Sequence, residues 1–233
     1  MPIGDDLNDI SIKALSILKK VNFIFCESLD FHRRLNENFG IDFSNKKIIP
    51  LENGGDGIRK LKLIKFLIKK QEDFVFISDS GIPCFLDPGS GILNFILEHF
   101  YNEIKFFPVG VSSALDVALI LVSKFCDHGF VFDSKFNKIR FDKKQYFAQK
   151  NNLPFILFVD YEDLNALLRL LKKTNFNNKI LLLANLAKKE KKQRTEPVYK
   201  LFLGDLLKIK NDIRFLTPND DIIIVLLPSL CSE

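Results

Sequence analysis

The sequence predicts an α/β protein that folds as two α/β domains. Short apolar runs typical of buried strands alternate with longer segments in which apolar residues recur at helical spacing. The chain has 233 residues, of which 47% are hydrophobic, so it can bury a substantial core. We expect a boundary near the turn from Pro108 to Ser113, with an N-terminal domain over residues 1–110 and a C-terminal domain over residues 111–233.

The first half of the chain is predicted to alternate helices and strands. Asp9 is expected to cap the first helix, and Gly40 is expected to end the second. Ser112 or Ser113 is expected to cap the last helix of this half. The expected helices cover residues 10–21, 32–39, 58–70, 92–100 and 114–121, and the expected strands cover residues 22–26, 47–50, 74–77 and 104–107.

The second half repeats this alternation with different content. The expected strands cover residues 130–132, 155–159, 180–184 and 221–227, and a helix is expected over residues 164–173. The pattern predicts a second α/β or mixed sheet. The order and direction of its strands cannot be read from one sequence.

The most informative stretch is the turn from Ser78 to Gly89, which is rich in glycine and proline and follows an apolar strand directly. Such a turn presents backbone N–H groups and the carboxylates of Asp79 and Asp87 at the carboxyl edge of a sheet, where open α/β folds bind small ligands. The turn from Pro108 to Ser113 would aim the first N–H groups of a helix at the same cleft. Together the two turns predict a ligand cleft, whereas the second alone also fits an ordinary strand-to-helix connection.

Composition and spacing limit the kinds of site that the chain can hold. The formal net charge of +5 comes from 34 Lys and Arg against 29 Asp and Glu, a mild excess that favours anionic partners. The 4 cysteines and 3 histidines lack the paired spacing of a metal or redox site, so we expect buried thiols and no metal. No apolar run approaches the roughly 20 residues of a membrane span and no signal peptide is readable, which predicts a cytoplasmic protein without a membrane segment.

Four separate segments together resemble one known family. They are Pro2-Ile3-Gly4 before a helix, Cys26-Glu27 followed by His32-Arg33-Arg34-Leu35, the turn from Ser78 to Gly89, and Val109-Gly110 with Ser112-Ser113. Their order and spacing, across nearly the whole chain, resemble the tetrapyrrole (corrin/porphyrin) methylase superfamily. Within it, the chain is most similar to the branch that includes the small-subunit ribosomal RNA (cytidine-2′-O)-methyltransferase.

This resemblance implies two α/β domains with S-adenosylmethionine in the cleft between them, usually in a homodimer. The residues that it places around the cofactor are Pro2, Ser78, Asp79, Ser80, Ile82, Ser113, Phe158 and Ala184. The function that it implies is methyl transfer to RNA, as ribose 2′-O-methylation of ribosomal RNA. A ribose hydroxyl would benefit from a general base, and among the carboxylates near the matched motifs the candidate is Glu27, whose alternative role is a cap.

Several basic clusters fit an RNA partner, because clustered cations can follow phosphates. The candidates for RNA contact are Arg33, Arg34, Lys188, Lys189, Lys191 and Lys192. The helix over residues 58–70 and the stretch from Lys135 to Lys144 are also basic. The alternative is that these lysine-rich faces are simply solvated. The aromatic residues that would stack on bases if exposed are Phe136, Phe141, Tyr146 and Phe147.

The chain departs from the family pattern at its start and on the substrate side. Family members usually have a strand before the Pro-Ile-Gly loop, whereas this chain starts at Met1-Pro2, so we expect the first strand to be missing or encoded upstream. The segments 28–30, 133–136 and 160–164 replace substrate-side motifs. The alternative function is therefore a degenerate, non-catalytic relative that binds RNA or a protein partner. Methylation of a tetrapyrrole is a third hypothesis, which rests on superfamily likeness alone.

Overall fold

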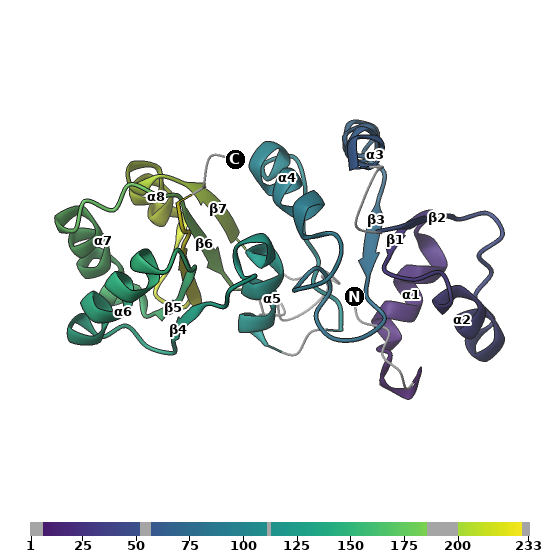
Figure 1. Cartoon of the computed structure of the whole chain (residues 1–233), viewed down its shortest axis with the longest axis horizontal. Helices are drawn as coiled ribbons and strands as arrows, with labels where there is room; N and C mark the ends of the chain where they lie inside the picture. Colours follow the sequence, from purple (N-terminus) through teal and green to yellow (C-terminus); the bar gives the residue numbers. More distant parts are fainter. Residues whose placement is uncertain (1–6, 52–56, 111–112, 186–199, 230–233) are drawn as a thin grey trace. The chain divides into compact units, whose positions relative to one another are not determined.

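The computed structural model describes residues 7–51, 57–110, 113–185 and 200–229. The chain divides into two compact units, Met1–Lys124 and Phe125–Glu233, and each holds one β-sheet with its own helices (Figure 1). The predicted α/β class with two sheets is confirmed. The division follows Lys124 rather than Gly110, so helix α5 (Ala114–Leu121) lies in the first unit. The domain boundaries stay a prediction.

The first unit is built on a three-stranded parallel sheet. Its strands are β1 (Phe23–Cys26), β2 (Lys47–Pro50) and β3 (Phe74–Ile77), in the order β2-β1-β3. The strands pair in register, so that Cys26 stands beside both Pro50 and Ile77. All three strands therefore end level, and the segments that follow them start from one edge of the sheet.

Helices cover both faces of this sheet. Ile24 and Cys26 of β1 pack with α1 (Ile12–Lys20) and α2 (Phe31–Phe39). Phe25, between them, packs with α3 (Gly57–Lys70) and α4 (Ser90–Phe100). This alternation follows from the two-residue period of a strand. The expected helices and the strands β1, β2 and β3 are confirmed with small shifts at their ends.

Two expectations for the first unit are wrong. Ser11 rather than Asp9 caps α1, because the Ser11 hydroxyl oxygen accepts a hydrogen bond from a first-turn N–H at 3.1 Å while Asp9 lies in a short 3₁₀ turn. Residues 104–107 form no strand, although Ile104 and Phe106 pack on the cluster of α3 and α4. A strand needs a hydrogen-bonded neighbour as well as alternating side chains, and within the described ranges β3 pairs only with β1.

The second unit is built on a five-stranded mixed sheet in the order β4-β5-β8-β6-β7. The strands are β4 (Val131–Asp133), β5 (Phe155–Val159), β6 (Ile180–Ala184), β7 (Lys200–Gly204) and β8 (Ile222–Leu226). β8 lies between β5 and β6 and is antiparallel to both. Every residue of β8 is buried, which explains why this strand is a continuous apolar run.

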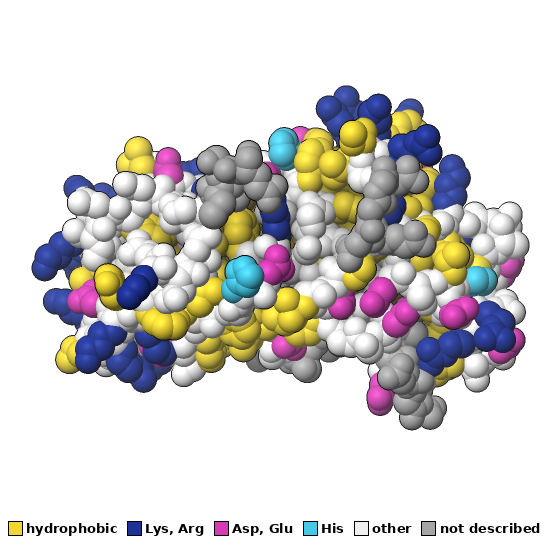
Figure 2. Space-filling view, viewed as in Figure 1, with side chains coloured by type: hydrophobic (Ala, Val, Ile, Leu, Met, Phe, Trp, Pro, Cys, Tyr) yellow, Lys and Arg dark blue, Asp and Glu magenta, His cyan; other side chains and the backbone are white. Residues whose placement is uncertain are grey.

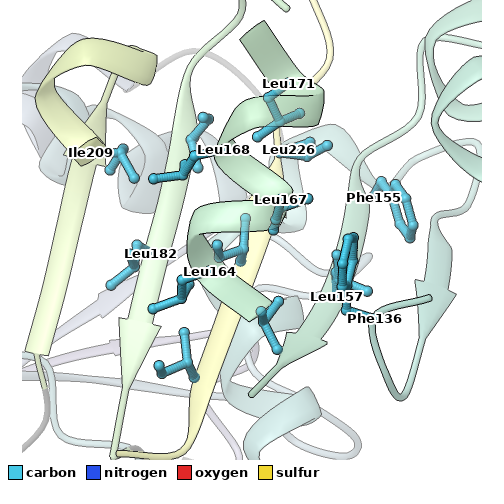
Figure 3. Close-up of a cluster of buried hydrophobic side chains, with 14 of the residues drawn as sticks. Phe136, Phe155, Leu157, Leu164, Leu167, Leu168, Leu171, Leu182, Ile209 and Leu226 are labelled. Carbon is cyan, nitrogen blue, oxygen red and sulfur yellow. The ribbon is translucent and has the colours of Figure 1, made fainter. Parts of the chain in front are cut away.

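Helix α7 (Leu164–Lys173), which was predicted, supplies the centre of the second core. Its leucines recur at the spacing of one helical face and lie with Leu182 of β6 and Leu226 of β8 (Figure 3). The leucines of this face are Leu164, Leu167, Leu168 and Leu171. The core therefore depends on one amphipathic helix that lies on the sheet.

Three elements of the second unit were not predicted from the sequence: α6 (Lys138–Lys150), β7 and α8 (Leu206–Asp212). Asn137 is the N-cap residue of α6, and its side-chain oxygen accepts hydrogen bonds from two first-turn N–H groups. The buried face of α6 includes a glutamine and an alanine, so large apolar residues do not recur at helical spacing in its sequence. Short 3₁₀ turns cover Leu7–Asp9, Ser123–Phe125, Tyr161–Asp163 and Ile213–Phe215. Across the described residues, no helix is long and apolar enough to cross a membrane.

Leu167→Ala is expected to lower the free energy of unfolding by about 2–5 kcal/mol, because Leu167 is fully buried and its truncation leaves a cavity in this core. Urea denaturation followed by circular dichroism measures the change. Leu207→Ala, at a leucine of α8 that is 71% exposed, is the matched control and should stay within about 0.5 kcal/mol of the parent. Equal losses in the two variants would contradict this description of the core.

Candidate functional site

The carboxyl edge of the first sheet brings the two turns together. Glu27 follows β1, Ser78 follows β3, and these strands end level. The backbone N–H of Asp79 donates a hydrogen bond to Glu27 Oε2 at 3.3 Å, which ties the two strand ends. Val109, at the start of the second turn, belongs to the same apolar cluster as Ile77 of β3. Both turns therefore begin at one edge of the sheet.

The turn after β3 is held in shape by residues with left-handed backbone. Cys84, Leu86 and Gly89 have φ values of 65°, 59° and 109°. A Cβ atom at Gly89 would lie 3.0 Å from a methyl carbon of Leu51, the residue that follows β2. Glycine is therefore required at position 89 by both its φ and its contact. The turn is packed against the end of β2 as well as continuing β3.

Three carboxylates gather at this edge: Glu27, Asp79 and Asp87. Partial burial raises the pKa of Asp87, and the negative charges of Glu27 and Asp79 raise it further. In the described part of the chain, no ion pair neutralises any of the three. Figure 2 shows acidic side chains in a row across the first unit, near the carboxyl end of β3. An edge of this charge favours a cationic ligand and repels phosphate.

These carboxylates are not arranged as a metal centre. In residues 7–51, 57–110, 113–185 and 200–229, no three or more His, Cys, Asp and Glu side chains are placed to hold a metal ion. Cys26 and Cys84, which lie close to the edge, are buried free thiols, as is Cys126. Burial raises the pKa of each of these thiols to about 12. The predicted buried thiols are confirmed at these three positions.

Ser113 caps α5 through a reciprocal pair of hydrogen bonds. Its hydroxyl oxygen accepts from the N–H of Asp116 at 3.1 Å, and its own N–H donates to Asp116 Oδ2 at 3.0 Å. The predicted cap is therefore confirmed, with Ser113 in this role. Because the hydroxyl oxygen already accepts a hydrogen bond, what Ser113 offers a ligand is chiefly its hydroxyl proton.

The predicted cofactor residues of the turn after β3 differ in exposure. Ser78 is 2% exposed, and its hydroxyl donates to the carbonyl oxygen of Gly81 at 3.5 Å. Asp79 and Ile82 are half-buried, and Ser80 is exposed. A ligand at this edge would therefore meet Asp79, Ser80 and Ile82 before it met Ser78.

Two predicted cofactor residues belong to the second unit. Phe158 in β5 pairs with Ile223, and Ala184 at the end of β6 pairs with Ile222. Both therefore lie toward the edge of the sheet at which β8 begins. Ala184 is fully buried, so a ligand at this edge would contact its neighbours rather than its side chain.

The predicted RNA contacts are only partly described. Arg33 is exposed and Arg34 is half-buried on α2, whose N-cap residue is Asp30. The predicted residues outside the described ranges are Pro2, Lys188, Lys189, Lys191 and Lys192.

Helix α6 separates the predicted stacking residues into two kinds. Phe136 and Phe141 are 8% and 1% exposed and belong to the second core, so they do not meet the condition of exposure set for stacking on bases. Tyr146 and Phe147 of α6 are 67% and 54% exposed. The sequence pattern could not make this distinction because the helix that sorts these side chains was not predicted.

A network that was not predicted links Asn185 to Lys200 through Asp220. Asn185 precedes segment 186–199 and Lys200 follows it. One carboxylate oxygen of Asp220 accepts from the Asn185 amide at 2.6 Å, and the other accepts from the Lys200 ammonium at 2.9 Å. Burial opposes ionisation, but these hydrogen bonds, the Thr217 N–H and the Lys200 charge lower the pKa of Asp220 to about 2. An asparagine directly after an apolar strand is the signal that could have found it.

Comparison with known proteins finds distant relatives. No protein-family model matches the sequence. The chain is 33% identical over 133 residues to Ribosomal RNA small subunit methyltransferase I of Borrelia garinii subsp. bavariensis, which covers 57% of this chain and 55% of that protein. It is 27% identical over 190 residues to the protein of the same name from Buchnera aphidicola subsp. Schizaphis graminum, which covers 78% of this chain and 62% of that protein. The matches confirm the predicted resemblance at the level of distant homology.

The chain spans less than two thirds of the length of these relatives. Among solved structures it is similar to uroporphyrin-III C-methyl transferase from Thermus thermophilus complexed with S-adenyl homocysteine, at 16% identity. That similarity covers 97% of this chain and 94% of the other, with a TM-score of 0.33, which is too low to carry an argument.

Asp220→Asn is expected to lower the free energy of unfolding at neutral pH by about 1–3 kcal/mol, because it removes the charge that accepts from Lys200. The pKa of Asp220 is depressed in the folded protein, so this stabilisation is present above the ordinary carboxyl range and is lost as the pH falls toward 2. Urea denaturation between pH 7 and pH 2 measures both effects. Asp160→Asn, at an exposed ion pair with Lys135, is the control and should change little. A loss of stability in Asp220→Asn that did not shrink at low pH would contradict the ionic role.

Proposed function

We propose that this chain, a distant homologue of the ribosomal RNA small subunit methyltransferase I proteins, is an S-adenosylmethionine-dependent methyltransferase that acts on RNA. The sequence similarity is the observation that carries the proposal. By the same similarity we propose ribose 2′-O-methylation of ribosomal RNA, in the cytoplasm, by a homodimer. The chemistry of the carboxyl edge in the first unit supports the choice of cofactor.

The carboxylates at this edge suit a cofactor that carries positive charge. S-adenosylmethionine has a sulfonium centre and an ammonium group. Glu27, Asp79 and Asp87 lie near one another, and their repulsion contributes to the raised pKa of Asp87. A cationic ligand would relieve that repulsion, whereas a cofactor with phosphate groups would add to it. The charge of the edge therefore favours a sulfonium cofactor over a phosphorylated nucleotide.

The proposed cofactor contacts divide by chemistry. Asp79 would pair with a cationic group, and Ser80 with the backbone of its turn would bind polar groups of the ribose or amino acid part. Ile82 would contact the adenine, since it is an apolar, half-buried side chain of this turn. Ser113 would donate its hydroxyl proton. Pro2, Ser78, Phe158 and Ala184 complete the proposed set.

Bound S-adenosylmethionine would supply an activated methyl group. The task of the protein is then to hold the acceptor in line with that group, and positioning alone can contribute much of the rate. Glu27 is the proposed base. Its Oε2 accepts from the N–H of Asp79, which leaves Oε1 to accept a proton from a ribose hydroxyl.

A second candidate is a non-catalytic relative that binds RNA, and the start of the second unit favours it. Asp133 is buried and forms ion pairs with Arg140 at 3.5 Å and Lys144 at 3.2 Å. Phe136 is also buried in the core. The segment that replaces a substrate-side motif of the family therefore serves packing. Methylation of a tetrapyrrole has no such support.

Transfer of a labelled methyl group to undermethylated small-subunit ribosomal RNA tests the proposal. Turnover would exclude the non-catalytic alternative. Binding of S-adenosylmethionine without methyl transfer to any RNA would support the proposed cofactor and contradict the proposed RNA substrate. No binding and no transfer would overturn both.

Asp79→Asn is expected to weaken binding of S-adenosylmethionine about three- to tenfold, because it removes a charge that attracts the sulfonium. Binding of S-adenosylhomocysteine, whose sulfur is neutral, should change less. Isothermal titration calorimetry with both ligands measures the difference. Asp73→Asn, at an exposed acid before the amino end of β3, is the matched control and should leave both affinities unchanged. Equal weakening of both ligands by Asp79→Asn would contradict the electrostatic role.

A further inference from the structure

A separate pocket opens in the second unit, where β5 and β6 begin and β8 ends. Phe155 and Leu226, paired across β5 and β8 and labelled in Figure 3, are among its apolar lining residues. The opposite edge of the sheet holds Phe158 and Ala184, so the pocket is distinct from the proposed cofactor residues. Its volume is about 230 Å³. Pockets for drug-sized ligands have volumes of about 300 Å³ or more. The smaller volume of this pocket suits a ligand with a single ring system.

The lining of the pocket is polar but neutral. Among the described residues that line it, none carries a charge. Side-chain amides are the main polar groups, and each offers both hydrogen-bond donors and an acceptor. A neutral lining of this kind does not suit phosphate or a cation. The lining amides are Gln145, Gln149, Asn152, Asn175, Asn177 and Asn178.

Gln145, one of the lining residues, has a buried side-chain acceptor. It is 2% exposed, and its Nε2 donates to Thr174 Oγ1 at 3.0 Å. The Thr174 hydroxyl donates its own proton to the Leu171 carbonyl, so the oxygen of Thr174 must accept from Gln145, which fixes the orientation of the amide. Gln145 Oε1 is buried without a hydrogen-bond partner among the described residues. A buried acceptor without a partner costs stability, so the wall behind the exposed amides is polar and incompletely hydrogen-bonded.

The surroundings of the pocket suit a nucleic acid strand. Tyr146 follows Gln145 on α6, on the side of Gln149, and is exposed. Lys143 and Lys150 of α6 are exposed, as are the lysines at the end of α7, and Figure 2 shows Lys and Arg side chains gathered over this part of the second unit. Aromatic faces stack on bases, and cations follow phosphates. A free nucleoside would use none of these outer groups.

We propose that this pocket binds one unpaired base of a single-stranded RNA, with a neighbouring base on Tyr146 and phosphates near the lysines at the end of α7. The base edge exchanges hydrogen bonds with the exposed amides of Gln149 and Asn177. Bases in a duplex have these edges paired, so the pocket selects single strands. The inference rests on the proposed action on RNA and adds a site where the RNA is held.

Fluorescence anisotropy with a short labelled single-stranded RNA, and with the same sequence as a duplex, tests the pocket. The double variant Gln149→Ala/Asn177→Ala removes two exposed lining amides. It should bind the single strand about five- to tenfold more weakly and the duplex unchanged, because loss of contacts to a base costs about this much. Asn165→Ala, at an exposed amide of α7 outside the pocket, is the matched control and should bind as the parent does.

Three results would overturn the inference. They are an unchanged affinity of the double variant for the single strand, an equal loss for single strand and duplex, and binding of free nucleosides as tightly as the RNA. An unchanged thermal midpoint of the double variant shows that its fold is intact. Cofactor titration separates this site from the proposed function. If the parent protein transfers methyl groups but the double variant binds RNA as tightly as the parent, the proposed RNA site is wrong and the proposed function stands. If the double variant binds RNA more weakly but the parent protein binds no cofactor, the proposed methyltransferase function is wrong and the RNA site stands.

Discussion

The level ends of β1, β2 and β3 are the constraint on which the candidate site depends. Because Cys26, Pro50 and Ile77 stand side by side, the polar segments that follow them start from one edge. A shift of the register by one residue would turn alternate side chains to the opposite face of the sheet. Ile24 and Phe25 would then exchange the two helix layers that they pack against. The packing of the helices thus fixes the register, and the register brings Glu27 and Asp79 together.

Much of the fold was predictable because strands and helices leave periodic patterns. α7 is the clearest case, since its leucines mark one face at helical spacing. Pairing is not periodic, and so the central place of β8 could not be read from the sequence. Residues 104–107 show the same limit, because they have the alternation of a strand without a neighbour in the described ranges. α6 escaped prediction because its buried face includes the amide of Gln145.

The candidate site was predictable only where its residues are continuous in the sequence. The turn from Ser78 to Gly89 is continuous in the sequence, so its composition pointed to the edge directly. The meeting of Glu27 with Asp79 could not be seen, because it depends on strand pairing between distant segments. The amide pocket draws on α6, on the segment after α7 and on the end of β8, and no single stretch of the sequence displays it. A mild net charge of +5 also conceals an acidic edge on the first unit and basic helices in both units.

The position of β8 has a consequence for synthesis on the ribosome. Chains emerge from the amino end, and domains fold as their residues become available. Within the described ranges, the strands of the first sheet lie between Phe23 and Ile77, so their pairing can finish early. β5 and β6 must wait for the strand that separates them, with unpaired apolar edges exposed meanwhile. The nascent second unit is therefore the stage at which this protein most needs protection from aggregation.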